Sequence, residues 1–143
     1  MNAPGTQAIG RVGFIGLGGM DLGMAHNVLR GGYELSVYGR RADVVQELVD
    51  AGASTTGSVA ELAGECQVLL TCLPGPRQLE DVALGDGGIA ESMGEGLTLI
   101  DFSTSSVALA RRIDEAAAAI EADLRQYVGD RAFYTVAQLP ERE

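Results

Sequence analysis

The chain has 143 residues, which suits one domain with a single core. Twenty acidic residues against ten basic ones give a formal net charge of -10, which disfavours nucleic acid or an anionic membrane as partner, because both need a basic face. All ten basic residues are arginine, so a mechanism or a Walker-type phosphate loop that needs lysine is excluded for this chain.

Segment 1–9 has neither the basic start nor the apolar run of a signal peptide, and we expect it to be flexible. No apolar run approaches the ~18 residues of a membrane span. Cys66 and Cys72 flank a predicted strand that would separate them by about 20 Å, beyond disulfide reach. Free thiols predict a cytoplasmic protein. One histidine and no close cysteine pair predict that the chain has no transition-metal site.

Four short runs of branched or aromatic residues predict strands at 11–15, 35–38, 68–71 and 97–101. Helical spacing predicts helices between them: one from about Met20 to the glycines at 31–32, one over 42–52 and one over 58–64. The glycine-rich segment 84–96 is predicted to be a loop with one helical turn. This alternation of strands and helices is typical of a parallel sheet with crossover helices.

The segment after the fourth strand is predicted to form a long last helix, which several Ser and Thr residues could cap. Glu121 and Arg125 are placed to pair at i and i+4, and an apolar stripe recurs at helical spacing through Leu109, Ile113, Ala116, Ile120 and Leu124. This pattern predicts that the helix runs to Tyr127 and ends at Gly129. Residues 132–139 are predicted to add one more strand, although their alternation is poor.

The stretch VGFIGLGGMDLGMA, residues 12–25, has the order of strand, glycine turn and helix start that binds a dinucleotide pyrophosphate. Gly16 would make the tight turn, Gly18 would let the backbone approach the pyrophosphate, and Gly19 adds a further flexible position. The helix start offers free N–H groups and a positive dipole end. Asp21 stands where the third glycine of GxGxxG belongs, and we expect it to weaken nucleotide binding without breaking the helix.

The end of the second predicted strand indicates which cofactor is preferred. A carboxylate at this place accepts the ribose 2′-OH of NAD, whereas an arginine accommodates the 2′-phosphate of NADP. The sequence has Gly39, Arg40 and Arg41 here, which favours NADP over NAD. The alternative is that both arginines are solvated surface charges.

Three stretches resemble, in order and spacing, the cofactor domain of the β-hydroxyacid dehydrogenases, the family of 3-hydroxyisobutyrate and 6-phosphogluconate dehydrogenases. They are VGFIGLGGMDLGMAHNVLRGGYELSVYGRR, VLLTCLPGPRQLEDV and LGDGGIAESMGEGLTLIDFSTSS, and the resemblance covers residues 11 to about 118. It implies a single α/β domain over 10–118 with a Rossmann-like, doubly wound parallel sheet in a three-layer αβα arrangement. Residues 119–143 would be a helix extension and a tail.

The resemblance also implies the residues of the site. Leu73 and Pro74 would border the cofactor, Gln78 would take the polar position one turn on, and Thr104 with Ser103 would approach the nicotinamide and the substrate. The expected cofactor-binding residues are Gly16, Leu17, Gly18, Gly19, Met20, Arg40, Arg41, Leu73, Pro74, Gln78 and Thr104. The alternatives are a strand stop at 73–74 and a helix cap at 103–104.

The sequence departs from the family at Asp21, where members carry glycine, and at Val107, where they usually carry proline. Family members also continue into a helical substrate domain with a catalytic lysine, and this sequence contains no lysine. We therefore expect an NADP-binding domain of a dehydrogenase for 3-hydroxy acids, catalytically incomplete alone and without a catalytic residue of its own.

We expect such a domain to form a homodimer through the surface that a helical domain would cover. Two further hypotheses stay open. One is an active oxidoreductase that takes its acid and base from another chain. The other is a non-catalytic interaction or scaffold module whose cofactor site has decayed.

Overall fold

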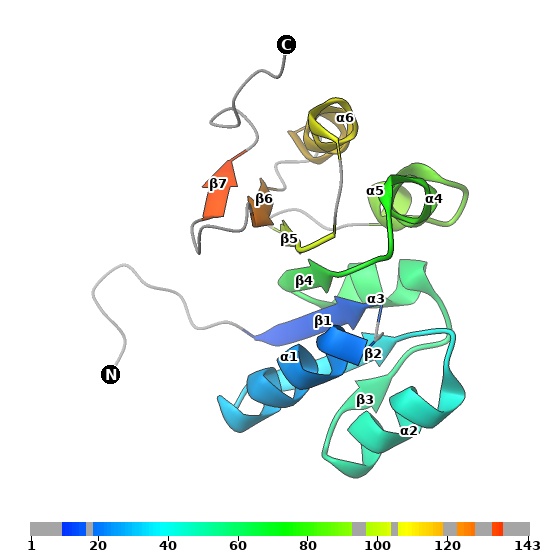
Figure 1. The fold of residues 1–143 in the computed structure, drawn as a ribbon, viewed down its shortest axis with the longest axis vertical. Helices are drawn as coiled ribbons and strands as arrows, with labels where there is room; N and C mark the ends of the chain where they lie inside the picture. Colours follow the sequence, from blue (N-terminus) through cyan, green and yellow to red (C-terminus); the bar gives the residue numbers. More distant parts are fainter. Residues whose placement is uncertain are drawn as a thin grey trace.

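The computed structural model describes residues 10–16, 19–92, 97–103, 106–118, 123–127 and 133–135. Strands and helices alternate along most of the chain (Figure 1). The strands are β1 Arg11–Ile15, β2 Glu34–Tyr38, β3 Ser54–Thr55, β4 Val68–Thr71, β5 Thr98–Asp101, β6 Asp123–Tyr127 and β7 Phe133–Thr135. The helices are α1 Gly19–Arg30, α2 Ala42–Asp50, α3 Val59–Glu65, α4 Pro76–Leu84, α5 Ile89–Ser92 and α6 Val107–Ala118.

All described strands belong to one sheet with the order β3-β2-β1-β4-β5-β6-β7. The pairs from β3 to β6 are parallel, and β7 is antiparallel to β6. The chain first extends the sheet from β1 through β2 to β3, and then returns to the other side of β1 with β4. This reversal confirms the predicted α/β fold with a Rossmann-like, doubly wound sheet.

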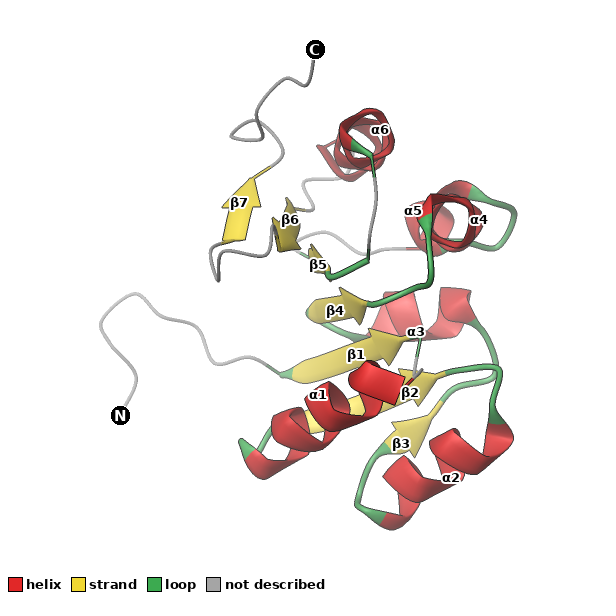
Figure 2. Ribbon diagram, in the orientation of Figure 1, coloured by secondary structure: helices red, strands yellow, loops and turns green. Residues whose placement is uncertain are grey.

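Side chains of each central strand alternate between the two faces, and each face is covered by its own helices (Figure 2). On one face, Phe14, Val37 and Leu70 pack with Ala25 of α1 and with α2. On the other face, Ile15 and Leu99 belong to a core cluster with α3, α4, α5 and α6. The central strands are therefore apolar on both faces, as is typical of parallel sheets covered on both sides.

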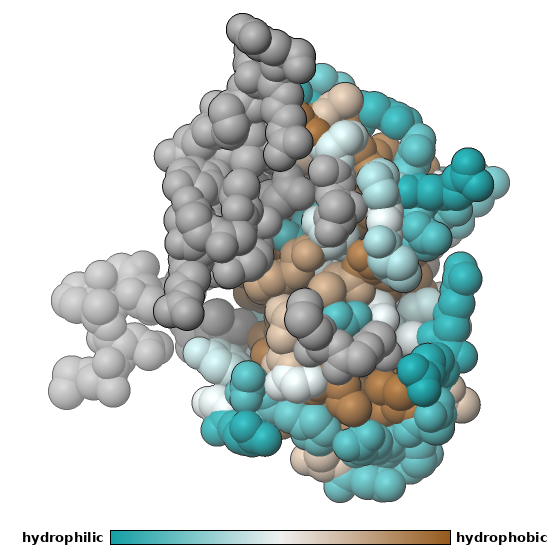
Figure 3. All heavy atoms as spheres, viewed as in Figure 1, coloured by the Kyte–Doolittle hydropathy of each residue, from teal (hydrophilic) through white to brown (hydrophobic). Residues whose placement is uncertain are grey.

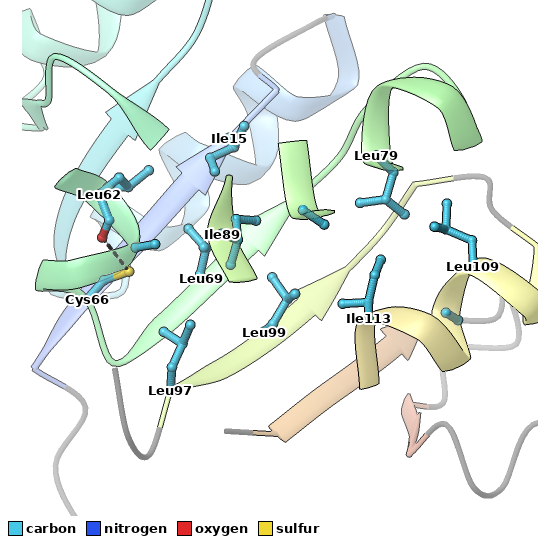
Figure 4. Close-up of a cluster of buried hydrophobic side chains, with 13 residues drawn as sticks. Ile15, Leu62, Cys66, Leu69, Leu79, Ile89, Leu97, Leu99, Leu109 and Ile113 are labelled. Atoms are coloured by element: carbon cyan, nitrogen blue, oxygen red, sulfur yellow. Dashed lines mark hydrogen bonds between the residues drawn. The ribbon is translucent and has the colours of Figure 1, made fainter. Parts of the chain in front are cut away.

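The larger cluster is centred on Leu69 and Leu99, with side chains from all four helices of that face around them (Figure 4). Cys66 lies at its edge, where the thiol donates a hydrogen bond to the Leu62 carbonyl oxygen at 3.1 Å. The outer surface of α1 and α2, at the bottom of the view in Figure 3, is mostly hydrophilic. No helix among the described residues is long and apolar enough to cross a membrane.

Helix ends follow local chemistry. α1 ends before Gly31 and Gly32, and Gly32 has a φ of 85°, which favours glycine. α6 begins after Ser106, whose Oγ accepts a hydrogen bond from Leu109 N at 3.1 Å. The predicted serine cap of the last helix is thus confirmed at Ser106.

The predicted extension of the last helix to Tyr127 is wrong. α6 ends at Ala118, and residues 123–127 form β6, which pairs in parallel with β5. Pairing with β5 supplies partners for backbone groups along an otherwise open sheet edge, and this outweighs an apolar spacing that is compatible with a helix. Arg125 lies in β6, and Glu121, its predicted helical partner, lies outside the described residues. Of the strand predicted at 132–139, the described part is β7.

Candidate functional site

The carboxyl ends of four strands lie side by side at one edge of the sheet. Ile15 of β1 is in register with Tyr38 of β2 and with Thr71 of β4, and Thr71 is in register with Asp101 of β5. We refer to this row of strand ends, with the turns that follow, as the carboxyl edge. Ligands of doubly wound sheets bind outside this edge, where the strand order reverses. The reversal lies here between β1 and β4.

Gly16, at the end of β1, packs directly against the turn after β4. Its φ is 122°, and a Cβ at this position would overlap the backbone carbonyl oxygen of Cys72. Cys72 N in turn donates a hydrogen bond to Ile15 O at 3.1 Å. Only glycine fits this tight turn without displacing backbone. Leu17 and Gly18 lie outside the described residues, while Gly19 and Met20 form the start of α1.

Asp21 lies in the first turn of α1 and is 6% exposed. Its side chain accepts a hydrogen bond from the Cys72 thiol. Burial, reinforced by this carboxylate, raises the pKa of Cys72 to about 12, so the thiol keeps its proton at neutral pH and acts as the donor. Asp21, a buried acidic residue at the start of α1, therefore occupies the position of the third glycine of GxGxxG.

Arg40 and Arg41 follow β2 and are exposed. Arg41 Nη2 lies 3.4 Å from Asp43 Oδ2, so its charge is partly neutralised within its own turn. Arg40 has no hydrogen bond or ion pair with any other described residue. Arg40 is thus the cation of this turn that is available to an anion outside the protein.

The turn after β4 carries the other predicted cofactor contacts. Leu73 is half-buried and packs against the larger core cluster, while Pro74 is exposed. Gly75 precedes α4, and Gln78 is exposed in the first turn of that helix. No helix was predicted here, although proline at a first helical position is a known start signal.

The turn after β5 is tied to the turn after β4. Ser103 is 5% exposed, and its Oγ accepts a hydrogen bond from Leu73 N at 2.8 Å. Ser103 N donates to Asp101 Oδ1 at 3.0 Å, and Thr71 Oγ1 donates to the same oxygen at 2.9 Å. Burial raises the pKa of Asp101, while the hydrogen bonds from Ser103 and Thr71 act in the opposite direction. Thr104 lies outside the described residues.

The structure therefore brings Gly16, Leu73 and Ser103 into one packed group and places Arg40 and Arg41 at the same edge, one strand away. Gln78 lies farther along the chain, on α4. The sequence pattern did not indicate that Thr71, Cys72 and Asp101 make side-chain contacts at this edge. A polar residue at the end of β4 and of β5 was the available signal, but neither residue type nor spacing shows that Thr71 and Asp101 bond to each other.

The arrangement can bind and orient an anionic ligand with its turn at Gly16, its helix start and Arg40. His26 lies about two turns beyond the start of α1 and so away from this edge, and its Nε2 is 3.4 Å from Glu47 Oε1 of α2. Within the part of the chain that the structure describes, no group of three or more His, Cys, Asp or Glu side chains could hold a metal ion.

Comparisons with known proteins agree with this geometry. Residues 11–125 match the family described as the NAD binding domain of 6-phosphogluconate dehydrogenase. The uncharacterized oxidoreductase YkwC of Bacillus subtilis is 39% identical over 106 residues, which cover 74% of this chain and 37% of that protein. A probable mitochondrial 3-hydroxyisobutyrate dehydrogenase of Dictyostelium discoideum is 36% identical over 108 residues, which cover 76% of this chain and 34% of that protein.

A solved structure described as Psf3 in complex with NADP+ and 2-OPP has a TM-score of 0.74 and 27% identity. The match covers 80% of this chain and 40% of that one. The chain thus spans about a third of the length of the curated relatives it matches.

Proposed function

We propose that this chain binds NADP(H) along the carboxyl edge. The chain belongs to the family of the NAD binding domain of 6-phosphogluconate dehydrogenase, and the proposal starts from that membership. Family membership confirms the resemblance to the β-hydroxyacid dehydrogenases. The observation that carries the proposal is that Gly16, Arg40 and Ser103, which come from three separate segments, follow strands whose ends are aligned in register. Such a row spans the length of an extended dinucleotide.

The pyrophosphate would lie at the start of α1, next to Gly16, where helix N–H groups and the helix dipole favour a phosphate. The adenosine half would then lie over β2, because the residue at the end of that strand reads the adenosine ribose in this fold. The nicotinamide half would extend the other way, over β4 and β5, beside Leu73 and Ser103.

Preference for NADP over NAD follows from the turn after β2. A carboxylate that would accept the ribose 2′-OH is replaced by Gly39, and Arg40 has no partner among the described residues. A guanidinium can donate two parallel hydrogen bonds to a 2′-phosphate, a geometry that favours phosphate over hydroxyl. The similarity to Psf3, which was solved in complex with NADP+, supports the same choice.

We propose that this cofactor domain serves a dehydrogenase for 3-hydroxy acids, as the name of the Dictyostelium relative suggests. Bound NADP+ supplies the hydride acceptor, while the residues of this chain bind the cofactor, orient it and shield one side of it. The sequence has no lysine, and His26 lies about two turns along α1, away from the carboxyl edge, so the acid and base for the substrate hydroxyl would come from outside this domain. We further propose that the protein is cytoplasmic and forms a homodimer. Sedimentation of the pure protein would test the dimer, and fractionation of cells would test the location.

The buried Asp21 favours a second candidate function, a scaffold module whose cofactor site has decayed. A carboxylate in the first turn of α1 opposes an anionic ligand at the helix start. Calorimetric titration of the pure protein with NADPH and with NADH separates the two candidates. The dehydrogenase hypothesis predicts binding of both cofactors, tighter for NADPH; no heat of binding from either supports the scaffold.

A second assay tests whether the domain is incomplete. We expect the chain alone to show no reduction of NADP+ with 3-hydroxyisobutyrate, because its sequence has no lysine, the residue that acts on the substrate hydroxyl in the family it resembles. NADPH formation that depends on this chain would instead support the active oxidoreductase.

A further inference from the structure

A buried set of hydrogen bonds joins the turns after β4 and β5. The Asp101 carboxylate is 3% exposed and accepts hydrogen bonds from Thr71 Oγ1 at 2.9 Å and from Ser103 N at 3.0 Å. The Ser103 hydroxyl also hydrogen-bonds to this carboxylate, and it accepts a hydrogen bond from Leu73 N at 2.8 Å. Asp101 is therefore connected to the backbone of Leu73 through a single side chain.

Sheet pairing alone does not account for this connection. Thr71 and Asp101 are already in register, and Phe102 N donates to Thr71 O at 2.7 Å as the last rung between the two strands. Beyond that rung the chain leaves the sheet in two turns, and the hydrogen bond from Leu73 N to Ser103 Oγ joins them. The bond from Ser103 N to Asp101 extends this connection to the end of β5.

Keeping the Asp101 side chain ionised at this buried position costs free energy of desolvation. Burial raises the pKa of Asp101, which means that desolvation disfavours the charged form in the folded protein. An amide of the same shape would fill the space without a charge to desolvate. What the carboxylate adds is stronger hydrogen bonds to several donors at once, and hence a more narrowly defined position for the two turns.

Leu73 and Ser103 flank the place where the nicotinamide half of the cofactor would lie. The pyrophosphate would occupy the turn after β1 and the adenosine would lie over β2, so the remaining half extends over β4 and β5. Asp101 itself is too deeply buried to touch a ligand.

We propose that Asp101 is a positioning residue for the nicotinamide half, because it holds the turns at Leu73 and Ser103 in the arrangement that this half requires. The inference rests on the proposed function, since it needs a bound dinucleotide. It also assigns Ser103 a role in connecting the turns, because its hydroxyl is used by Asp101 and by Leu73 N.

The test compares two ligands that differ only in the nicotinamide half: NADPH, and 2′-phospho-ADP-ribose, which lacks the nicotinamide. Asp101→Asn should weaken NADPH binding about tenfold, which equals ~1.4 kcal/mol, and should change the affinity for the fragment less than about twofold. We expect this variant to fold, because the amide needs no charge desolvated. Circular dichroism and the thermal midpoint check that it does.

Ser103→Ala provides a second route to the same test, since it removes the acceptor of Leu73 N and leaves the carboxylate in place. It should show the same selective loss, and the double variant should lose less than the sum of the two, because both act through one connection. The matched control is Ser36→Ala. It removes another buried hydroxyl, which accepts from Arg11 Nη1 at 2.7 Å away from these turns, and should lower stability without changing either affinity.

Equal weakening of NADPH and the fragment in Asp101→Asn would overturn the proposal, since a purely structural role affects both halves alike. Unchanged NADPH affinity in a folded variant would overturn it as well, while leaving the proposed function intact. If Asp101→Asn does not fold, the comparison of the two ligands in Ser103→Ala decides by the same criteria. If the natural sequence binds neither ligand, the proposed function fails, and this inference fails with it.

Discussion

The Cys72 thiol donates a hydrogen bond to the buried Asp21 carboxylate, and this contact joins the turn after β4 to the first turn of α1. In the GxGxxG fingerprint, the third glycine has no side chain, and this lets the first turn of the helix approach the strand closely. Here an acidic side chain occupies the approach and has a protein partner. The helix start is thereby stabilised by a negative charge of its own, which competes with the negative charge of a phosphate.

Replacing Asp21 should therefore change affinity and stability in opposite directions. At ~6 Å and an effective dielectric near 20, repulsion between a carboxylate and one phosphate charge is about 2 to 3 kcal/mol. Screening by salt reduces this value, so we expect Asp21→Gly to bind NADPH at least about tenfold more tightly. The same variant should lose about 1 to 2 kcal/mol of unfolding free energy, because glycine disfavours helix and the dipole contact is lost. Calorimetry and urea unfolding measure the two effects.

Asp21→Asn separates charge from size, because it keeps the volume and removes the negative charge. If repulsion limits the site, this variant should recover most of the gain. A gain confined to glycine would mean that bulk near the helix start is the obstacle. If neither variant binds NADPH better than the natural sequence, Asp21 does not limit the site and the scaffold hypothesis is strengthened.

The two thiols predict a loss of stability at alkaline pH. Burial, with a contribution from Glu65, raises the pKa of Cys66 from 9.0 to about 11, and burial with Asp21 raises that of Cys72 to about 12. Above pH 9.0 the unfolded chain releases these protons while the folded chain keeps them, so the unfolded state binds fewer protons and stability falls as pH rises. Urea unfolding at about pH 8 and about pH 10 should show this fall.

Cys72→Ser is the matched control for that measurement, because a serine hydroxyl can still donate to Asp21 but does not titrate in this range. The fall between the two pH values should be smaller in this variant. An identical fall in both proteins would show that other groups cause it.

Arg40 and Arg41 should contribute unequally to NADPH binding. Arg41 is held 3.4 Å from Asp43, whereas Arg40 has no partner among the described residues. Arg40→Ala should weaken NADPH by about 1.5 to 3 kcal/mol, the usual range for a hydrogen bond to a charged group, and weaken NADH much less. Arg41→Ala is the control and should have the smaller effect. Equal losses for NADPH and NADH in Arg40→Ala would count against a 2′-phosphate site.

Gly16 and Gly32 allow steric overlap to be separated from backbone strain. Both have positive φ, at 122° and 85°, so alanine is strained at either position. At Gly32 an added Cβ meets nothing within 4 Å, whereas at Gly16 it overlaps the Cys72 carbonyl. Gly32→Ala should lower the unfolding free energy by about 1 kcal/mol and leave NADPH binding unchanged. Gly16→Ala should be clearly more destabilising and should abolish binding; equal effects would contradict the packing described for this turn.

The central fold was predictable because its strands and helices have clear patterns. The predicted strands at 11–15 and 68–71 match β1 and β4 residue for residue, and the predicted helices at 42–52 and 58–64 lie within two residues of α2 and α3. Branched, apolar runs that are buried on both faces leave few alternatives.

The parts that were missed depend on contacts between distant segments. Ser54 and Thr55 form β3 only because they pair with β2, and two polar residues carry no pattern of their own. The apolar spacing that leads into residues 123–127 fits a helix, but these residues form a strand because they pair with the edge of β5. The hydrogen bond from Leu73 N to Ser103 Oγ joins residues that are 30 positions apart. The resemblance to the family predicted that both residues lie near the cofactor, but it did not predict that they bond to each other.

The most direct test of the central claim is a titration of isotope-labelled protein with NADPH, followed by backbone amide NMR. We predict shifts at the carboxyl edge, at Gly16, Arg40, Leu73 and Ser103, that saturate together. The opposite ends of the strands provide an internal reference, since Arg11 and its neighbours Glu34 and Gln67 should remain unchanged. Absence of any shift at high NADPH, or shifts confined to the ends near Arg11, would contradict binding at the carboxyl edge.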